Sequence, residues 1–294
     1  MTDAAYHRPA TLDAALVLKA REPMARYVAG GTDLWVQARK RKAAPVPLIS
    51  LQNIAELRGI SVGDKGLRIG ATTPLSDLLR HELVRAELPA LAMALGTLAS
   101  QQIRNVATVA GNLCNASPAA DTAPPLLVHD ASVELRGASG TRTVSLASFL
   151  VGPGKTALAP GELLAAIVVP RPAKGTKSAF LRQGRVAMDL SLASVAALVC
   201  IEDDRQAPVV RLAAGAVGPV PMRLPKAEAA LAGRPLDAAA LVAAAEVAAD
   251  EVAPITDLRA SAGYRRRLVR VLCERALRLA VGDKEIHHEV HHAG

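Results

Sequence analysis

The pattern of hydrophobic and polar positions separates a mixed first part of the chain from a second part in which strands precede helices. Up to about residue 172, short apolar stretches alternate with segments of helical spacing. Residues 67–71 are expected to form a strand, after which Thr72 or Thr73 caps a helix. Strand-like patterns then dominate residues 131–170. This alternation predicts a unit of mixed α and β structure.

The second part begins after a predicted linker formed by Pro170, Pro172 and residues 173–177. Two long runs rich in strand-forming residues come first, at 189–202 and 208–224. Three helical segments follow, two of them rich in alanine, at 225–234, 237–252 and 261–281. Strands followed by helices, with no internal repeat, indicate a separate unit that ends near residue 284.

A strand, a glycine pair and the start of a helix follow one another in the stretch YVAGGTDL, residues 27–34. Gly30 and Gly31 expose backbone N–H groups, and Thr32 or Asp33 is expected to begin the helix. Phosphate groups bind at such helix starts because the free amides and the helix dipole both favour an anion. Considered alone, however, the stretch fits an ordinary Gly-Gly turn better than a phosphate site.

The stretch ATVAGNLCNASPAAD, residues 107–121, repeats this chemistry later in the chain. Thr108, Ala110, Gly111 and Asn112 offer a turn of small residues with a hydroxyl and an amide. Two such loops can hold the phosphates of a dinucleotide from opposite sides. Asp121 then either accepts hydrogen bonds from ribose hydroxyls or caps the next helix, and the sequence leaves both interpretations open.

Other familiar cofactor and metal patterns are missing from the sequence. No G-x-G-x-x-G is present, which disfavours a doubly wound dinucleotide domain. The stretch GPGKT lacks the first glycine of a triphosphate-binding loop, because Phe149 stands there. The three separated cysteines indicate neither a disulfide framework, nor a zinc site, nor an iron–sulfur cluster. No serine or cysteine has an evident base beside it, so no catalytic side chain and no metal ligand is expected.

The terminal stretch KEIHHEVHHAG carries four histidines, which a helix would place on adjacent turns in a geometry able to grip a metal. A flexible tail is the favoured interpretation.

Composition and charge exclude further classes of protein. The formal net charge is +8, but aromatic residues make up only 2% of the chain and the basic residues are scattered. A solvated basic surface that docks an acidic partner is therefore favoured over a nucleic-acid site. No apolar run is long enough to span a membrane and no signal-peptide pattern is present, so a cytoplasmic protein is expected.

Seven stretches, in family order from about residue 4 to 284, resemble the FAD-binding medium subunit of molybdenum hydroxylases, the family of carbon monoxide, xanthine, aldehyde and aryl-coenzyme A dehydrogenases. They are YVAGGTDLWVQ, RIGATTPLSDLL, ASQQIRNVATVAGNLCNASPAAD, GPGKTALAPGELL, AFLRQGRVAMDLSLASVAA, GAVGPVPMRLPKAEAAL and ITDLRASAGYRRRLVRVLCERAL. The resemblance implies an α+β fold. A two-subdomain FAD-binding fold of the vanillyl-alcohol-oxidase (PCMH-type) class would be followed by a C-terminal domain with a three-stranded antiparallel sheet and a helical bundle. The implied divisions are 1–57 and 58–172 for the FAD-binding subdomains, 177–284 for the C-terminal domain and 285–294 for a flexible tail.

The resemblance also implies FAD, bound non-covalently, and a set of residues around it. The loop that wraps one side of the pyrophosphate would be Tyr27, Val28, Ala29, Gly30, Gly31, Thr32, Asp33 and Leu34. The loop on the other side would be Thr108, Val109, Ala110, Gly111 and Asn112. The residues placed nearer the flavin and the sugar hydroxyls would be Leu98, Ala99, Asp121, Leu164 and Arg182. Leu181 aligns as well as Arg182, and Ala110 stands where the family usually has glycine, so it would crowd one phosphate.

The function that the resemblance implies is electron transfer within a complex. The chain would accept electrons from the [2Fe–2S] clusters of a small partner subunit and pass them through FAD to an external acceptor. A large molybdopterin-binding subunit would carry out the hydroxylation, in a heterotrimer or a dimer of heterotrimers. Two alternatives remain: a structural assembly subunit with weakened FAD binding, which Ala110 suggests, and a self-contained flavin oxidoreductase.

Overall fold

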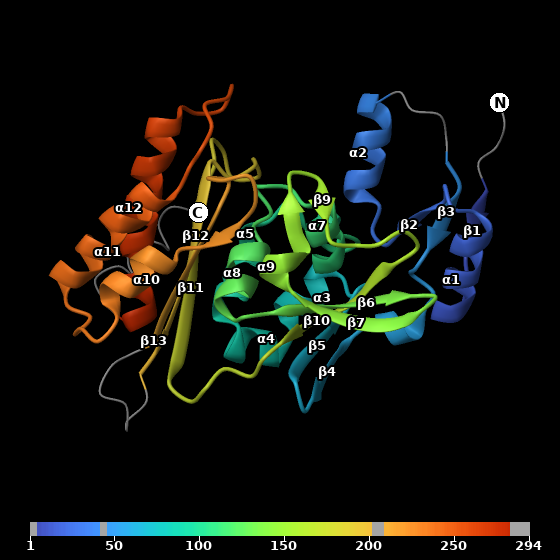
Figure 1. Cartoon of the computed structure of the whole chain (residues 1–294), viewed down its shortest axis with the longest axis horizontal. Helices are drawn as coiled ribbons and strands as arrows, with labels where there is room; N and C mark the ends of the chain where they lie inside the picture. The colour runs from blue at the N-terminus through green and yellow to red at the C-terminus, as the bar shows by residue number, and fades with distance from the viewer. Residues whose placement is uncertain (1–4, 42–45, 202–208, 283–294) are drawn as a thin grey trace.

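Three larger sheets, each associated with its own hydrophobic core, lie in a row along the long axis of the molecule (Figure 1). The computed structural model describes residues 5–41, 46–201 and 209–282. The predicted tail 285–294 and its four histidines lie outside the described residues. Within the described part of the chain, no helix is long and apolar enough to cross a membrane.

The first unit is a parallel sheet in the order β1-β3-β2. Its elements are β1 (Tyr6–His7), α1 (Leu12–Arg21), β2 (Arg26–Val28), α2 (Thr32–Arg41) and β3 (Leu48–Ser50). Parallel neighbours need crossover connections, and the two helices provide them. As predicted, a helix starts at Thr32 directly after the glycine pair. Because α2 follows β2 along the chain after Ala29, Gly30 and Gly31, the helix start lies at the carboxyl end of β2.

The middle unit is an antiparallel sheet in the order β4-β5-β10-β6-β7. Its strands are β4 (Ile60–Gly63), β5 (Gly66–Gly70), β6 (Ser132–Gly137), β7 (Gly140–Ser145) and β10 (Leu163–Val169). Its helices are α3 (Leu75–Arg80), α4 (Glu82–Glu87), α5 (Pro89–Thr97), α6 (Gln101–Arg104), α7 (Val109–Asn115), α8 (Ala123–Val128) and α9 (Leu146–Phe149). A hairpin of β8 (Leu150–Gly152) and β9 (Lys155–Thr156) completes it. A short helix η1 (Ala55–Leu57), whose Leu57 belongs to the first core, precedes β4 in the chain. Both faces of β10 are buried: Leu163 joins the first core and Ile167 the middle one.

The predicted helix cap after β5 is wrong. Pro74 occupies the N-cap position of α3, and no side chain caps that helix. The Thr72 hydroxyl instead donates to the Leu57 carbonyl (2.9 Å), and the Thr73 hydroxyl donates to the Gly59 carbonyl (3.0 Å). Both threonines are buried, so their hydroxyls satisfy the backbone of the neighbouring strand connection rather than a helix end.

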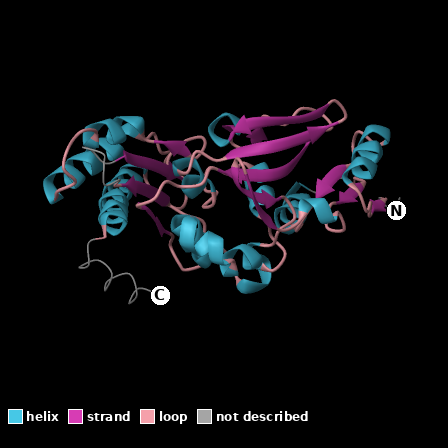
Figure 2. Ribbon diagram, turned by 90° about the horizontal axis from the view of Figure 1, so that it is seen from below, coloured by secondary structure: helices cyan, strands magenta, loops and turns pink. Residues whose placement is uncertain are grey.

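The C-terminal unit is an antiparallel sheet with helices on one face, as Figure 2 shows from below. Its elements are β11 (Thr176–Gln183), β12 (Ala193–Cys200), β13 (Val209–Gly215), β14 (Met222–Arg223), α10 (Pro225–Leu231), α11 (Ala238–Glu251) and α12 (Ala262–Val281). The three long strands match the expected three-stranded sheet, and β14 adds a two-residue edge. Because β11 begins at Thr176, the strand includes the last two residues of the predicted linker.

The central strand of the C-terminal sheet is buried along its whole length. Val195 and Val199 pack with α10–α12, whereas Ala196 and Leu198 belong to the core of the middle unit. A strand covered on both faces has a continuous apolar sequence, which explains the long β-rich run seen at this position. The C-terminal unit is therefore packed directly onto the middle unit.

Candidate cofactor site

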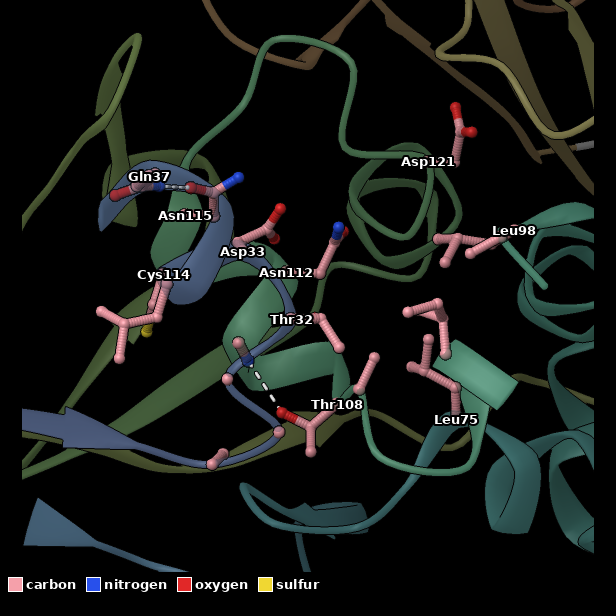
Figure 3. A pocket seen from close by; sticks show the side chains of 18 of the residues that line it. Thr32, Asp33, Gln37, Leu75, Leu98, Thr108, Asn112, Cys114, Asn115 and Asp121 are labelled. Carbon is pink, nitrogen blue, oxygen red and sulfur yellow. Dashed lines mark hydrogen bonds between the residues drawn. The ribbon is translucent and has the colours of Figure 1, made fainter. Parts of the chain in front are cut away.

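A cavity of about 550 Å³ lies among the three units, and most of the predicted cofactor residues line it. Figure 3 shows it with Gln37 and Asn115 toward one end and Asp121 and Leu98 toward the other. The predicted residues in its wall are Tyr27, Val28, Ala29, Gly30, Gly31, Thr32, Asp33, Leu34, Leu98, Ala99, Thr108, Gly111, Asn112, Asp121 and Arg182. This volume is within the range of cofactor and ligand sites.

The first wall of the cavity is formed by backbone. A side-chain Cβ at Gly30 would lie 2.0 Å from the Val106 carbonyl oxygen, so the first predicted loop touches the chain just before the second predicted loop at a point where only glycine fits. Gly31 has φ +71°, a conformation that favours glycine. The first amides of α2 have no partner within their helix, and Thr32 at that helix start lines the cavity. This wall suits an anion held by N–H groups.

The second predicted loop is the capped start of a helix rather than an open turn. Thr108 is the N-cap of α7, and its hydroxyl oxygen accepts from the Gly111 N–H at 2.9 Å. This hydrogen bond satisfies one of the amides that the sequence suggested would face a phosphate. The Asn112 Oδ1 accepts from the buried Thr122 hydroxyl at 2.7 Å, which orients the amide group of Asn112.

A hydrogen bond also joins the middle of α2 to the end of α7. Gln37 of α2 donates from Nε2 to Oδ1 of Asn115 of α7 at 2.6 Å (Figure 3). Because both residues line the cavity, this bond sets the spacing between α2 and α7 at that end.

The opposite wall of the cavity is charged. Asp121 and Arg182, which are 6% and 9% exposed in their side chains, form an ion pair with 3.2 Å between Oδ2 and Nη1. The Ser191 hydroxyl donates to Oδ1 of Asp121 at 2.6 Å. Burial raises the pKa of Asp121, and the Arg182 guanidinium opposes that shift. Arg182 also donates to the carbonyl of Asp189.

Two alternatives left open by the sequence are resolved by this wall. Thr122 is the N-cap of α8, and no side chain makes a capping bond there, so Asp121 is not a helix cap. Arg182 lines the cavity, whereas Leu181 packs against the C-terminal core. The basic side chain is therefore the one that faces the site.

Three predicted residues are not in the wall of the cavity. Val109, Ala110 and Leu164 all belong to the hydrophobic core of the middle unit. Ala110 is 4% exposed, so its methyl group packs into the core and does not narrow the cavity. The departure from the family's glycine thus gives no support to an assembly subunit with weakened FAD binding.

Several lining residues were not predicted. They are Arg26, Gln37, Leu75, Ile103, Ala107, Cys114, Asn115, Ala119, Gly154, Met188, Asp189 and Leu190. Ala107, Cys114, Asn115 and Ala119 lie in the stretch 107–121 that the sequence singled out, and Gly154 lies in GPGKT. The Gly154 N–H donates to the Ala116 carbonyl (2.9 Å) from the β8–β9 hairpin, which confirms that GPGKT is not a triphosphate-binding loop followed by a helix.

The fold and the site define a protein with a cavity suited to a phosphate-containing cofactor, and comparisons with known proteins identify it as a flavoprotein component of an oxidoreductase. Residues 2–172 match the model of the FAD binding domain in molybdopterin dehydrogenase, and residues 178–280 match the CO dehydrogenase flavoprotein C-terminal domain. The chain belongs to the family of FAD-binding medium subunits of molybdenum hydroxylases, of the xanthine and carbon monoxide dehydrogenase type.

Individual relatives match over nearly their whole length. The xanthine dehydrogenase FAD-binding subunit of Escherichia coli O157:H7 is 38% identical over 281 residues, which cover 95% of this chain and 96% of that protein. The carbon monoxide dehydrogenase medium chain of Hydrogenophaga pseudoflava is 32% identical, covering 94% and 96%. A solved structure of carbon monoxide dehydrogenase from Hydrogenophaga pseudoflava superposes with a TM-score of 0.89 at 33% identity, covering 94% of this chain and 96% of that chain.

Proposed function

We propose that the cavity is the FAD site, with the pyrophosphate against the start of α2. The observation that carries this proposal is the contact between Gly30 and the Val106 carbonyl, since it brings the first predicted loop against the chain that leads directly into the second, at a point where no side chain fits. The amides at the start of α2 supply donors for the phosphates. Asn112, oriented by Thr122, supplies a side-chain amide on the α7 side.

The charged wall would hold the polar middle of the cofactor in this proposal. The Asp121 carboxylate would accept hydrogen bonds from ribityl or ribose hydroxyls, and Arg182 and Ser191 would keep it in place. Leu98 and Leu190 give the wall apolar surface for a flavin ring. Under the same proposal the chain divides into FAD-binding subdomains at 1–57 and 58–172 and a C-terminal domain at 177–284.

The proposed role of the chain is electron transfer within a molybdenum hydroxylase. When bound, FAD supplies the redox chemistry, because a flavin exchanges electrons singly with iron–sulfur clusters and in pairs with an external acceptor. We expect the [2Fe–2S] clusters on a small partner subunit and molybdopterin on a large one. The names of the relatives, an FAD-binding subunit and a medium chain, support a place in such a complex. This chain's own residues bind the cofactor, orient it and limit its contact with water.

Purification of the protein from its native source tests the proposed role. The visible absorption spectrum and a denaturing gel of the same fraction would be recorded. Flavin bands together with one larger and one smaller chain are expected. A colourless protein would contradict the FAD site, and a yellow protein that turns over substrate without partner chains would support a self-contained oxidoreductase instead.

A glycine substitution tests the placement of the site. Gly31→Val puts a branched side chain at φ +71°, with its Cβ 2.8 Å from Nε1 of Trp35, and is expected to empty the site of FAD. Gly233→Val, at φ +70° where a Cβ meets nothing within 4 Å, is the matched control and should retain FAD. Equal FAD content in both variants would show that the loop at Gly31 does not hold the cofactor.

A further inference from the structure

A buried arginine outside the cavity connects the C-terminal helices to the charged wall. Arg265 lies on α12, is 1% exposed and does not line the cavity. From the contacts below we infer that Arg265 is a positioning residue for FAD: it fixes the backbone segments that hold Asp121 and Arg182. This inference rests on the proposed function, because it takes those two residues to face the cofactor.

The Arg265 guanidinium binds three chain segments at once. Its Nη1 donates to the Leu192 carbonyl at 2.7 Å and to the Ala216 carbonyl at 3.0 Å. Its Nη2 pairs with Oδ1 of Asp257 at 2.8 Å. A planar guanidinium held at several points is far better oriented than a flexible ammonium would be. Arg265 therefore fixes the positions of residues 192 and 216 relative to α12.

Leu192 transmits this constraint to both members of the charged pair. Its own N–H donates to the Gln183 carbonyl at 2.7 Å, directly after Arg182 at the end of β11. The residue before Leu192 is Ser191, which is fully buried and donates to Asp121 at 2.6 Å. The Leu192 carbonyl, held by Arg265, thus helps to fix the positions of Gln183, next to Arg182, and of Ser191, which contacts Asp121.

Ala216 provides a second connection to the same wall. Its N–H donates to the Pro118 carbonyl at 2.7 Å, while its own carbonyl accepts from Arg265. Ala216 has φ +63°, in the left-handed region that favours glycine. Such a conformation persists where its surroundings hold it on both sides, as Pro118 and Arg265 do here. The segment from Pro118 to Asp121 is therefore anchored at each end to chain that Arg265 holds.

A purely structural role for Arg265 makes a different prediction. Loss of the ion pair with Asp257 would destabilise the C-terminal unit, and any FAD loss would then follow from unfolding alone. The two roles are separated by a control variant on the same helix. Val269 is also fully buried and lies one turn away, but it packs in the C-terminal core. Val269→Ala should destabilise that unit without moving Leu192 or Ala216.

The experiment compares Arg265→Met, Arg265→Lys and Val269→Ala in the purified complex, with Asp121→Asn as a positive control. FAD dissociation constants and the visible circular dichroism of the bound flavin would be measured at a temperature where every variant is folded. Arg265→Met should weaken FAD binding about tenfold, which corresponds to about 1.4 kcal/mol of lost coupling between neighbouring groups, and should change the flavin dichroism. Arg265→Lys should recover part of the affinity, since one ammonium can still donate to a carbonyl.

The outcomes are distinct. If Asp121→Asn weakens FAD binding while Arg265→Met behaves like Val269→Ala, the positioning role is overturned. If Asp121→Asn itself leaves FAD affinity unchanged, the proposed cofactor site is wrong. Should Arg265→Met fail to fold, Ser191→Ala tests the next link: it removes only the hydroxyl that donates to Asp121, and it should also weaken FAD binding and alter the dichroism. Unchanged FAD affinity in Ser191→Ala would overturn the transmission through Leu192.

Discussion

One wall of the cavity is formed by backbone and the opposite wall by charged side chains, and in the proposed site both contact FAD. The α2 wall presents backbone, brought close by Gly30 and Gly31, and its donors belong to a helix start. The charged wall presents side chains, Asp121 and Arg182, which lie far apart in the sequence and meet only in the fold. Adding side-chain atoms to the backbone wall causes a steric clash. Removing one partner from the charged wall leaves a buried charge unpaired.

The substitution with the largest expected effect adds a side chain to the backbone wall. Gly30→Val would force a Cβ to within 2.0 Å of the Val106 carbonyl oxygen, so the glycine loop must move away from the chain that leads into α7. We expect a loss of about 5 kcal/mol of unfolding free energy, at the extreme end for single substitutions, and no bound FAD. Denaturant unfolding and the FAD to protein ratio measure this, with Gly63→Val, where a Cβ meets nothing within 4 Å, as the control. A folded, yellow Gly30→Val variant would contradict the close approach.

The second-largest effect is expected from removing one charge of the buried ion pair in the charged wall. Asp121→Asn leaves Arg182 buried beside a neutral group, which typically costs about 3–5 kcal/mol when a buried pair loses one partner. Asp77→Asn, in an exposed pair with Arg58, should cost less than about 1 kcal/mol. Chemical denaturation of the unmutated protein and of the two variants gives the comparison of unfolding free energies. Equal costs for Asp121→Asn and Asp77→Asn would show that the charged wall is not held by its buried ion pair.

A third effect concerns the packing between the middle and C-terminal units. Burial, with a contribution from Arg211, lowers the pKa of His129 to about 4, and His129 Nε2 lies 3.3 Å from the Ser178 hydroxyl. The unfolded chain takes up a proton near pH 6.5 and the folded chain only near pH 4, so stability is full above pH 6.5 and falls between those values. The loss is at most about 3 kcal/mol. Unfolding free energies at pH 7.5 and pH 4.5 measure it, and His129→Gln should reduce the difference.

The smallest effect is expected from removing the N-cap of α7, which tests whether the start of this helix contributes to FAD binding. Thr108→Ala removes the cap on Gly111 N–H and should cost about 1 kcal/mol of unfolding free energy. Thr11→Ala removes a comparable cap on α1, away from the cavity, where Thr11 accepts from the Ala14 N–H. Both variants should lose similar stability by denaturant unfolding, but only Thr108→Ala should also lower FAD affinity. Equal FAD affinity in the two variants would show that the start of α7 does not contribute to FAD binding.

Local patterns predicted the elements that depend on neighbouring residues. The helix start at Thr32 followed from the glycine pair, and the long apolar run at 189–202 led to the buried strand β12. The cap at Thr72 or Thr73 was mispredicted because their hydroxyls bond to Leu57 and Gly59, which lie close only in the folded chain. A threonine before a helix carries the same local signal in either case.

The sequence by itself determined the resemblance to the family, which implied the α+β fold class, and the helix start that follows Gly30 and Gly31. Each motif and this helix start depend on residues that are close in the chain. Only the tertiary structure decided that Ala110 faces the core, that Asp121 is not a cap and that Arg182 rather than Leu181 faces the cavity. It alone brought Arg265 to the carbonyls of Leu192 and Ala216. The physical reason is that side-chain direction and ion pairing depend on the packing of distant segments, which local spacing does not encode.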